Sequence, residues 1–247
     1  MTGRIGPTFP LPMNPLLRYL SLILISASVA LADHHSSHSI FNGKDLTGWS
    51  GDSSLWSVVD GTISGQTTAE APLELNTFLI FDHEVADFEF KAEFKLTGET
   101  ANSGVQYRSK IHDADKWIVG GYQADMDYIN RYTGMLYEER GRGIIIRPGI
   151  RAQINPGHTT KKPQLTSLGE GITAEEHKAA IRSGEWNEIR IVAKANHVRH
   201  YVNGVLTAEG LDTDPEHAAA SGALALQLHR GPPMTVQFRN LTLKSLR

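Results

Sequence analysis

Strict alternation of apolar and charged residues marks one segment of the chain most clearly. In Phe88–Leu96, FEFKAEFKL, five apolar residues alternate with two Glu–Lys pairs. A period of two puts successive side chains on opposite faces of a strand. One face is then buried and the other meets water, as is common in antiparallel sheets. We predict a half-buried antiparallel strand here.

Shorter segments with strand-like composition are separated by turn signals. Asp60-Gly61 predicts a hairpin between Leu55–Val59 and Thr62–Ser64, and Asn203-Gly204 predicts one between His197–Val202 and Val205–Ala208. Three further strands are expected at Trp186–Ala193, Gly222–Leu228 and Val236–Leu243. The polar stretch 151–171, with scattered Gly and Pro, is predicted to be a long loop.

One helix is expected among these strands. Thr173 and Glu176 have the spacing of a capping box, and the helix should run from Glu175 to about Ile181 and stop near Gly184. Many short strands with one short helix predict an all-β sandwich or jelly roll, not an α/β fold. A single domain over residues 39–247 is the simplest organisation.

The N-terminus has the features of an export signal. Arg4 and Arg18 are followed by the apolar run YLSLILISASVAL, which ends in Ala30-Leu31-Ala32. We interpret residues 1–32 as a signal peptide, because the run is short for a membrane span and the Ala-x-Ala site is well placed. Residues 33–38 would be a flexible leader. The mature protein is expected to be periplasmic or extracellular, with no membrane anchor after cleavage.

Charge and cysteine content narrow the function. Without residues 1–32 the chain has 22 Lys and Arg against 27 Asp and Glu, a formal net charge of −5. It contains no long basic cluster, so nucleic acid is not an expected partner. It contains no cysteine, which excludes disulfides, thiolate metal sites and cysteine nucleophiles.

Polar residues at alternating positions suggest a ligand-binding sheet face. Gln106 shares a strand face with Arg108, Gln123 with Asp125 and Asp127, and Gln227 with His229. Such donors and acceptors suit a polyhydroxylated ring. A water-facing sheet side explains the parity equally well. Glutamine, however, is not a strong strand former, and it recurs in all three strands beside Arg, Asp or His.

The order of several short motifs resembles one known family. These are FNGKDLTGW (41–49), NSGVQYR (102–108), GYQAD (121–125), GMLY (134–137), EWN (185–187), VNG (202–204), and QLH (227–229) followed by FRN (238–240). Together they resemble the 3-keto-disaccharide hydrolase family, also named 3-keto-glucoside 1,2-lyase / 3-keto-2-hydroxyglucal hydratase. The resemblance covers nearly all of the mature chain and implies a concanavalin-like jelly roll.

The family resemblance also implies a reaction. A ketone at carbon 3 of a sugar acidifies the hydrogen on carbon 2, so a base can remove it and the enolate can expel the substituent at carbon 1. Water then adds back to give the free 3-keto sugar. The substrate would be a 3-keto sugar or glycoside supplied by an upstream oxidoreductase. The paired carboxylates of ordinary glycosidases are not required.

Residue chemistry and strand parity, and not the resemblance, give our site hypothesis. Asp125 is the expected base and His229 the expected acid, although the two could exchange roles. Arg108 with Gln106 would stabilise the enolate. The ring would be oriented by Gln123, Gln227 and Tyr137. Glu138, Glu139, Arg140 and Arg142 either form an ion-paired rim or reach the site.

Other functions remain open from sequence alone. The main alternative is a non-catalytic, lectin-like carbohydrate-binding module of the same fold. A conventional jelly-roll glycoside hydrolase is a second, but the chain has no E-x-D-x-x-E strand signature. A structural domain of an exported complex is a third. We expect no cofactor and no metal. Calcium is the first candidate if a metal binds, at Asp125 with Asp127 or at Asp113 with Asp115.

Overall fold

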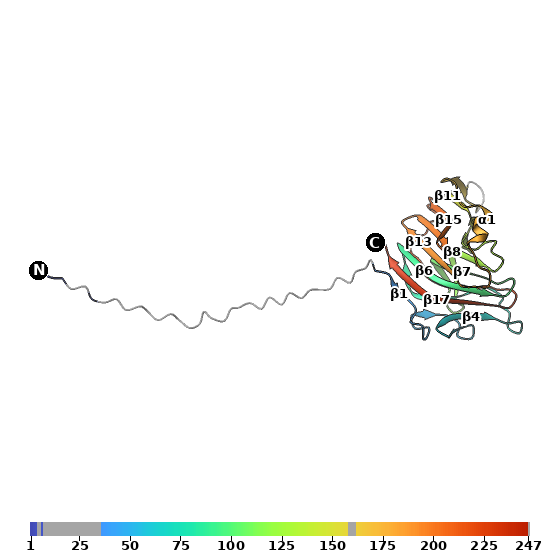
Figure 1. Cartoon of the computed structure of the whole chain (residues 1–247), viewed down its shortest axis with the longest axis horizontal. Helices are drawn as coiled ribbons and strands as arrows, with labels where there is room; N and C mark the ends of the chain where they lie inside the picture. Colours follow the sequence, from blue (N-terminus) through green and yellow to red (C-terminus); the bar gives the residue numbers. More distant parts are fainter. Residues whose placement is uncertain (4–5, 7–35, 158–161, 247) are drawn as a thin grey trace. The chain divides into compact units, whose positions relative to one another are not determined.

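A computed structural model describes residues 36–157 and 162–246, together with residues 1–3 and 6. The unit from Asp33 to Arg247 is described below (Figure 1). The predicted signal peptide and the first half of the predicted leader lie almost entirely outside the described residues. No helix in the described ranges is long and apolar enough to cross a membrane.

The described strands form two sheets. The larger, ten-stranded sheet consists in spatial order of β12 (Gln164–Ser167), β11 (Ile150–Asn155), β15 (Val205–Asp212), β14 (His197–Val202), β13 (Asn187–Lys194), β6 (Phe88–Thr97), β17 (Met234–Ser245), β4 (Thr62–Thr67) and β3 (Trp56–Val59), with β1 (His38–Ser39) paired to β17. The seven-stranded sheet consists of β10 (Gly143–Ile146), β9 (Leu136–Glu139), β8 (Ile118–Asp127), β7 (Asn102–Asp113), β16 (Gly222–Leu228), β5 (Thr77–Val85) and β2 (Trp49–Ser50).

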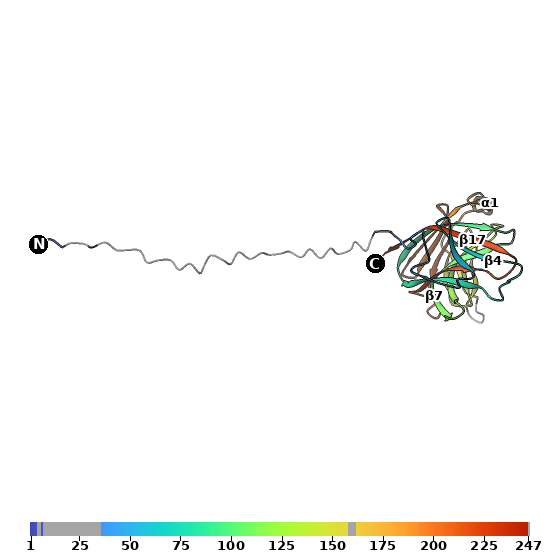
Figure 2. The same ribbon diagram turned by 90° about the horizontal axis from the view of Figure 1, so that it is seen from below.

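The hydrophobic core lies between the two sheets. On β6 the apolar residues from Phe88 to Leu96 are buried and the charged ones between them are half-buried, which confirms the predicted alternation. The Phe88 ring packs edge-on against Tyr107 of β7 at a centroid distance of 5.8 Å. The Tyr107 hydroxyl lies 2.8 Å from His200 Nε2 on β14, so a polar contact also joins the sheets. Figure 2 shows β17 and β4 in one layer and β7 in the other.

This is an all-β jelly-roll sandwich with one short helix among the described residues, as the sequence predicts. Helix α1 (Ala174–Ala179) has the predicted capping box, in which Thr173 and Glu176 bond each other's backbone N–H groups. It ends about two residues before Ile181. Both predicted hairpins are present, and Asp60-Gly61 and Asn203-Gly204 take the positive φ angles that such turns need.

The predicted loop over 151–171 is wrong. It contains most of β11 and all of β12, and β11 pairs in parallel with β15. Ala152 and Ile154 are buried, while the residues between them face outward. Arg151 forms an ion pair with Glu209 on β15. In β11 the outward-facing residues are polar, so the alternation of buried and exposed positions is hard to recognise in the sequence. Its partner β15 is distant in the chain, and local sequence cannot predict that pairing.

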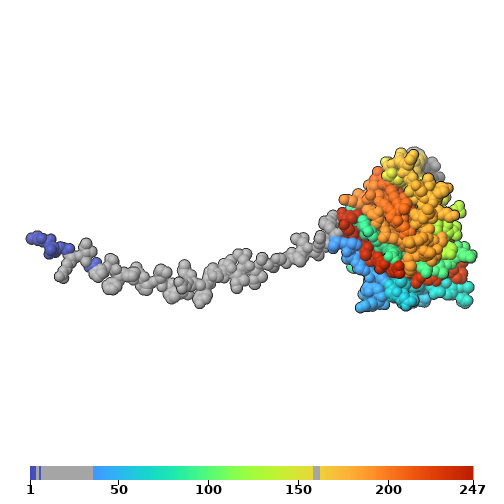
Figure 3. Space-filling view, in the orientation of Figure 1, coloured from blue at the N-terminus to red at the C-terminus, as the bar shows by residue number. Residues whose placement is uncertain are grey.

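The outer face of the ten-stranded sheet carries charged pairs and stacked cations. Figure 3 shows this face, with the green surface of β6 between the orange surface of β13–β15 and the red surface of β17. Arg239 pairs with Glu93 and lies over the Trp186 ring at 4.0 Å. These groups are partly exposed, and such pairs contribute little to stability. The outer face of the other sheet is different, because polar side chains are buried there.

The β6 alternation gives a direct test of the sandwich. Phe90→Ala empties a fully buried position and should lower the free energy of unfolding by about 3–5 kcal/mol. Lys91→Ala, one residue away on the outward face, should change it by less than about 0.5 kcal/mol. Urea unfolding of both variants measures the difference. Equal effects would contradict the assignment of the two faces.

Candidate functional site

The face of the seven-stranded sheet that points away from the core carries a buried group of amides and one carboxyl. Val105, Ala124, Met126 and Leu226 point into the core. The residues that alternate with them therefore point the other way: Gln106 on β7, Gln123 and Asp125 on β8, and Gln227 on β16. Gln106 pairs directly with Gln123 across β7 and β8. The predicted parity of these glutamines is confirmed.

A glycine makes room for this group. A Cβ atom at Gly104, which pairs with Asp125, would lie 2.6 Å from the Gln123 side chain. Any larger residue would displace Gln123 and with it the amide that contacts Asp125. The motif around residue 104 thus fixes the position of the neighbouring glutamine.

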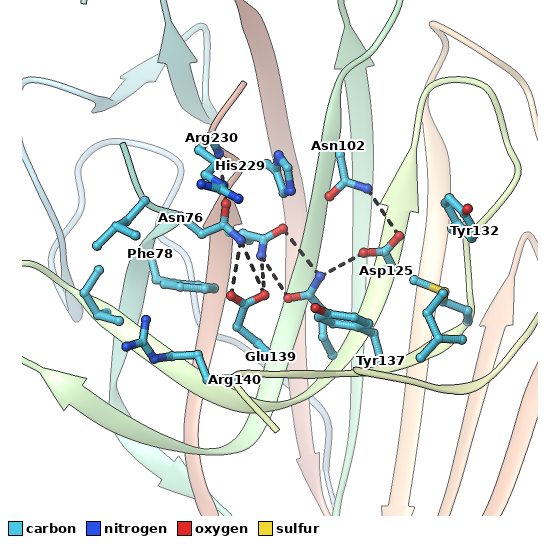
Figure 4. Close-up of a pocket in the computed structure, with 16 residues that line it drawn as sticks. Asn76, Phe78, Asn102, Asp125, Tyr132, Tyr137, Glu139, Arg140, His229 and Arg230 are labelled. Atoms are coloured by element: carbon cyan, nitrogen blue, oxygen red, sulfur yellow. Dashed lines mark hydrogen bonds between the residues drawn. The ribbon is translucent and has the colours of Figure 1, made fainter. Parts of the chain in front are cut away.

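A cavity of about 480 Å³ lies over this face (Figure 4). Its size is within the range of small-molecule sites. It is lined by Leu75, Asn76, Phe78, Asn102, Ile118, Gln123, Asp125, Tyr132, Met135, Tyr137, Glu139, Arg140, Ile144, Gln227, His229 and Arg230. Five of the seven predicted site residues are in this set: Gln123, Asp125, Tyr137, Gln227 and His229. Gln106 does not line the cavity but is fully buried, with its amide 2.7 Å from that of Gln123.

Arg108 is not part of the cavity, and the prediction that it shares a face with Gln106 is wrong. A β-bulge separates the Tyr107–Tyr122 pair from the next pair, Lys110–Gly120. Arg108 lies in that bulge with φ +48°, so the parity changes. Its buried guanidinium donates to the backbone carbonyls of Ala86, Ala195 and Ala219 and to Asp87 Oδ1 at 2.9 Å. Arg108 ties segments of the sandwich together.

The Asp125 carboxyl is the most strongly perturbed group of the cavity. Its side chain is almost fully buried, and burial raises its pKa well above the ordinary value. Gln123 Nε2 at 2.9 Å and Asn102 Nδ2 at 3.3 Å donate to it and oppose the rise. The negative charges of Asp127 and Glu139 reinforce it. A carboxyl of this kind transfers protons nearer neutral pH than an ordinary aspartate.

The other titratable groups of the cavity are also shifted by burial. Burial lowers the pKa of His229, so its imidazole is neutral at pH 7 and can accept a proton. Burial, with the charges of Glu139 and Asp125, raises the pKa of Tyr137, which remains a hydroxyl donor. Burial likewise raises the pKa of Glu139, against an opposing hydrogen bond from Asn76 and the charges of Arg140 and Arg230.

Sequence reasoning missed part of the lining. Asn76, Asn102 and Arg230 were not singled out as site residues. Glu139 and Arg140 were left open, and both line the cavity. Glu139 lies two residues after Tyr137 on β9, and that spacing was the available signal. Glu138 instead forms a buried ion pair with Arg142, which also binds Asp212 at 2.7 Å, away from the cavity.

The two carboxylates proposed as a calcium site have different roles. Asp127 accepts hydrogen bonds from the backbone N–H groups of Arg131, Tyr132 and Thr133 and so holds the turn after β8. Asp125 instead lines the cavity. Among the described residues, no cluster of three or more His, Asp or Glu side chains could hold a metal ion.

Replacement of Arg108 tests its structural role. Arg108→Met should lower the free energy of unfolding by about 1.5–3 kcal/mol, because three part-buried carbonyls and Asp87 lose the donors of one buried guanidinium. The control is Arg190→Met. Arg190 stacks over Tyr201 at 3.6 Å on the outer sheet face, and its loss should cost about 1 kcal/mol or less. Urea unfolding measures both, and a loss for Arg108→Met no larger than the control would contradict this role.

The raised pKa of Asp125 makes stability depend on pH in a defined direction. A carboxyl whose folded pKa is raised stabilises the fold below its unfolded pKa, near 3.9, and this contribution is lost as pH rises toward the folded pKa. Asp125→Asn removes that loss. The variant should melt above the wild type at pH 8, by about 2–4 °C for each 1 kcal/mol gained, and the difference should shrink toward pH 4. A difference independent of pH would contradict the burial effect.

Comparison with solved structures supports the fold. A candidate glycosyl hydrolase from Parabacteroides distasonis matches with a TM-score of 0.56 and 20% identity, over 85% of this chain and 94% of that one. A second from the same organism gives 0.54 and 19%, over 85% and 100%. The carbohydrate-binding module CBM66 from Bacillus subtilis gives 0.51 and 14%, over 80% and 96%. At these identities the likeness shows the sandwich fold alone.

Comparison with protein families is more specific. No curated protein sequence matches the chain. The family description of the 3-keto-alpha-glucoside-1,2-lyase-like domain, in contrast, matches residues 36–244, which include both sheets and every residue of the cavity. The resemblance seen in the motifs is confirmed, and a carbohydrate-related function follows. The chain belongs to the 3-keto-alpha-glucoside-1,2-lyase-like domain family.

Proposed function

We propose that the protein cleaves glycosides whose sugar ring is oxidised to a ketone at carbon 3. The observation that carries this proposal is the buried Asp125 carboxyl on the floor of a sugar-sized cavity that also holds the neutral His229 imidazole. These are two groups able to move protons at neutral pH. Family membership supplies the substrate class.

The reaction proceeds by elimination and hydration. A base takes the proton from carbon 2, and the electrons of that bond form an enolate with the carbon-3 ketone. The enolate re-forms the ketone and expels the carbon-1 oxygen, which takes a proton from an acid. Water then adds at carbon 1 and a proton returns to carbon 2. The net reaction is hydrolysis, so these steps require no redox cofactor.

The pKa directions favour one assignment of the two proton-transfer groups. His229 has a lowered pKa and is free to accept the carbon-2 proton. Asp125 has a raised pKa and is able to hold a proton for the departing oxygen. This reverses the roles first expected from sequence, where Asp125 was the base. Mutation of either group removes one half of the proton transfer.

The enolate needs positive charge or hydrogen-bond donors, and Arg108 cannot supply them. The cavity offers the Tyr137 hydroxyl, the Gln227 amide and the guanidinium groups of Arg140 and Arg230. Donors aimed at a developing oxyanion are worth most where water is excluded. We assign Tyr137 and Gln227 to the sugar ring and its ketone, and the two arginines to the rim.

The wider setting is also a proposal. The substrate implies an oxidoreductase that acts first and installs the ketone. If residues 1–32 act as an export signal, this chemistry takes place in the periplasm or outside the cell. The predicted leader and signal bear on where the protein works and not on how the cavity works.

A chromogenic substrate tests the function. Wild-type protein should release nitrophenol from 4-nitrophenyl 3-keto-glucoside and leave 4-nitrophenyl glucoside intact. Asp125→Asn and His229→Gln should each lower turnover by about 10²–10⁴-fold, because each removes a proton-transfer group. The matched control is Asp60→Asn, in the exposed β3–β4 turn where Asn also tolerates positive φ, and it should be fully active.

The outcomes are distinct. Full activity of Asp125→Asn would remove Asp125 from the mechanism. Binding of the 3-keto sugar by the wild type with no product after long incubation would favour the carbohydrate-binding module. Cleavage of the unoxidised glucoside at a similar rate would favour a conventional glycosidase.

A further inference from the structure

The side-chain amides of Gln123 and Gln106 form a row of contacts that begins at the Asp125 carboxyl. Gln106 and Gln123 are in contact at 2.7 Å, and Gln123 reaches Asp125 Oδ1 at 2.9 Å. All three side chains are at least 97% buried. Water therefore does not satisfy these groups, and each amide must direct its oxygen and its nitrogen to suitable partners.

The Gln106 amide has two orientations with different consequences. In the first, its nitrogen donates to Gln123 and its oxygen accepts from Ser109 Oγ at 2.7 Å, but that oxygen also faces the carbonyl oxygens of Gly121 and Tyr122 at 3.2 and 3.1 Å. The Gln106 oxygen and the two carbonyl oxygens are all hydrogen-bond acceptors, so no hydrogen lies between them and they repel one another. In the second, the two N–H bonds of the nitrogen are shared among the two carbonyls and Ser109 Oγ at 2.7 Å, and the oxygen faces Gln123. The second orientation gives the Gly121 and Tyr122 carbonyls a facing donor, but it places the Gln106 oxygen against the Gln123 oxygen unless Gln123 turns as well.

The β-bulge places these carbonyls beside Gln106. Tyr107 pairs with Tyr122 and Lys110 with Gly120, so Gly121 has no partner residue on β7. The same bulge that turns Arg108 away from the cavity thus leaves backbone acceptors beside Gln106. In the second orientation the Gln106 nitrogen can donate to these carbonyls, whereas an oxygen at the same place is a third acceptor beside them.

The second orientation determines the proton on Asp125. Because the Gln106 oxygen then faces Gln123, Gln123 must direct its nitrogen toward Gln106 and its oxygen toward Asp125 Oδ1. Two oxygens 2.9 Å apart require a hydrogen between them, and only a protonated carboxyl supplies it. We propose that Gln106 is a positioning residue that acts through Gln123 to hold a proton on Asp125.

The effect extends toward a second carboxyl. With Gln106 in its first orientation, Gln227 Nε2 lies 3.1 Å from the Gln123 oxygen and 3.5 Å from Glu139 Oε2. When Gln123 turns, Gln227 turns with it and presents its oxygen to Glu139, which favours a proton there as well. The cavity then loses negative charge near Arg140 and Arg230, and an enolate formed in it meets less repulsion.

The role of this Asp125 proton in catalysis rests on the proposed function. Asp125 is then the acid: its O–H bond breaks, the hydrogen passes to the departing carbon-1 oxygen, and a carboxylate is left. The first arrangement suits that carboxylate, because Gln123 Nε2 now donates to it. The two arrangements therefore match Asp125 before and after proton transfer.

The charged and titratable groups near Asp125 are known and bear on the same equilibrium. They are Asp127 on β8, Tyr132 after β8, Tyr137 and Glu139 on β9, Arg140 after β9, and His229 and Arg230 after β16. None of them contacts Gln106 in the described structure. A change at Gln106 thus reaches Asp125 through Gln123 alone.

Carboxyl ¹³C NMR of the substrate-free protein tests the proposal, with Asp125→Asn identifying the resonance. In the wild type, Asp125 should be protonated at pH 6, where an ordinary aspartate, with a midpoint of about 3.9, is ionised. Gln106→Met should move the titration midpoint to lower pH by about one pH unit, because one hydrogen-bond preference is lost. In a Gln123→Met background, Gln106→Met should have no further effect.

The control is Gln237→Met, which replaces a half-buried glutamine of the other sheet and should leave the midpoint unchanged. An ionised Asp125 at pH 6, or an unchanged midpoint in Gln106→Met, would overturn the proposal. If Gln106→Met does not fold, scalar coupling across hydrogen bonds in the wild type decides. Coupling of the Gln106 side-chain nitrogen to the Gly121 or Tyr122 carbonyl carbon supports the proposal, and its absence overturns it.

The NMR titration tests the inference about Asp125 separately from the proposed enzymatic activity. An inactive protein with a protonated, Gln106-dependent Asp125 would retain the inference and lose the proposed function. An active protein with an ionised Asp125 would retain the function and lose the inference.

Discussion

The site depends on one constraint, which is that the Asp125 carboxyl is kept out of water on the face of a rigid sheet. Burial makes its ionised form costly, and the neighbouring amides are too few to offset that cost. A carboxyl in this position is able to exchange protons in a pH range where free aspartate does not. The rest of the cavity keeps Asp125 largely out of water and, under the proposed function, positions the sugar beside it.

The sandwich provides that environment through ordinary strand geometry. The apolar residues of β7, β8 and β16 fill the core, so the residues between them are forced onto the opposite face. A single β-bulge then has two effects. It directs Arg108 to backbone carbonyls that connect distant segments, and it leaves the Gly121 and Tyr122 carbonyls beside Gln106. The same β-bulge therefore affects both the stability of the fold, through Arg108, and the hydrogen bonding around Gln106.

The sequence was sufficient to predict features that depend on the alternation of side chains along one strand or on the residues of one turn. The β6 alternation, both hairpins, the capping box and the outward parity of Gln106, Gln123 and Gln227 follow from residues close in the chain. It was insufficient where a distant strand or an irregularity decides. The bulge at Arg108 reversed a parity that counting residues cannot detect, and Asp127 turned to a cap because its strand ends there. The polar strand β11 is held by pairing with β12 and with the distant strand β15. Strand β5 was overlooked despite its apolar start.

The central claim is that a proton leaves and returns at carbon 2 of the sugar. Cleavage of a 3-keto glucoside in deuterium oxide, with the free sugar analysed by mass spectrometry and NMR, tests it most directly. The account predicts one deuterium at carbon 2 of the product, beyond the level seen with heat-inactivated protein. A product that keeps its original hydrogen at carbon 2 would contradict it.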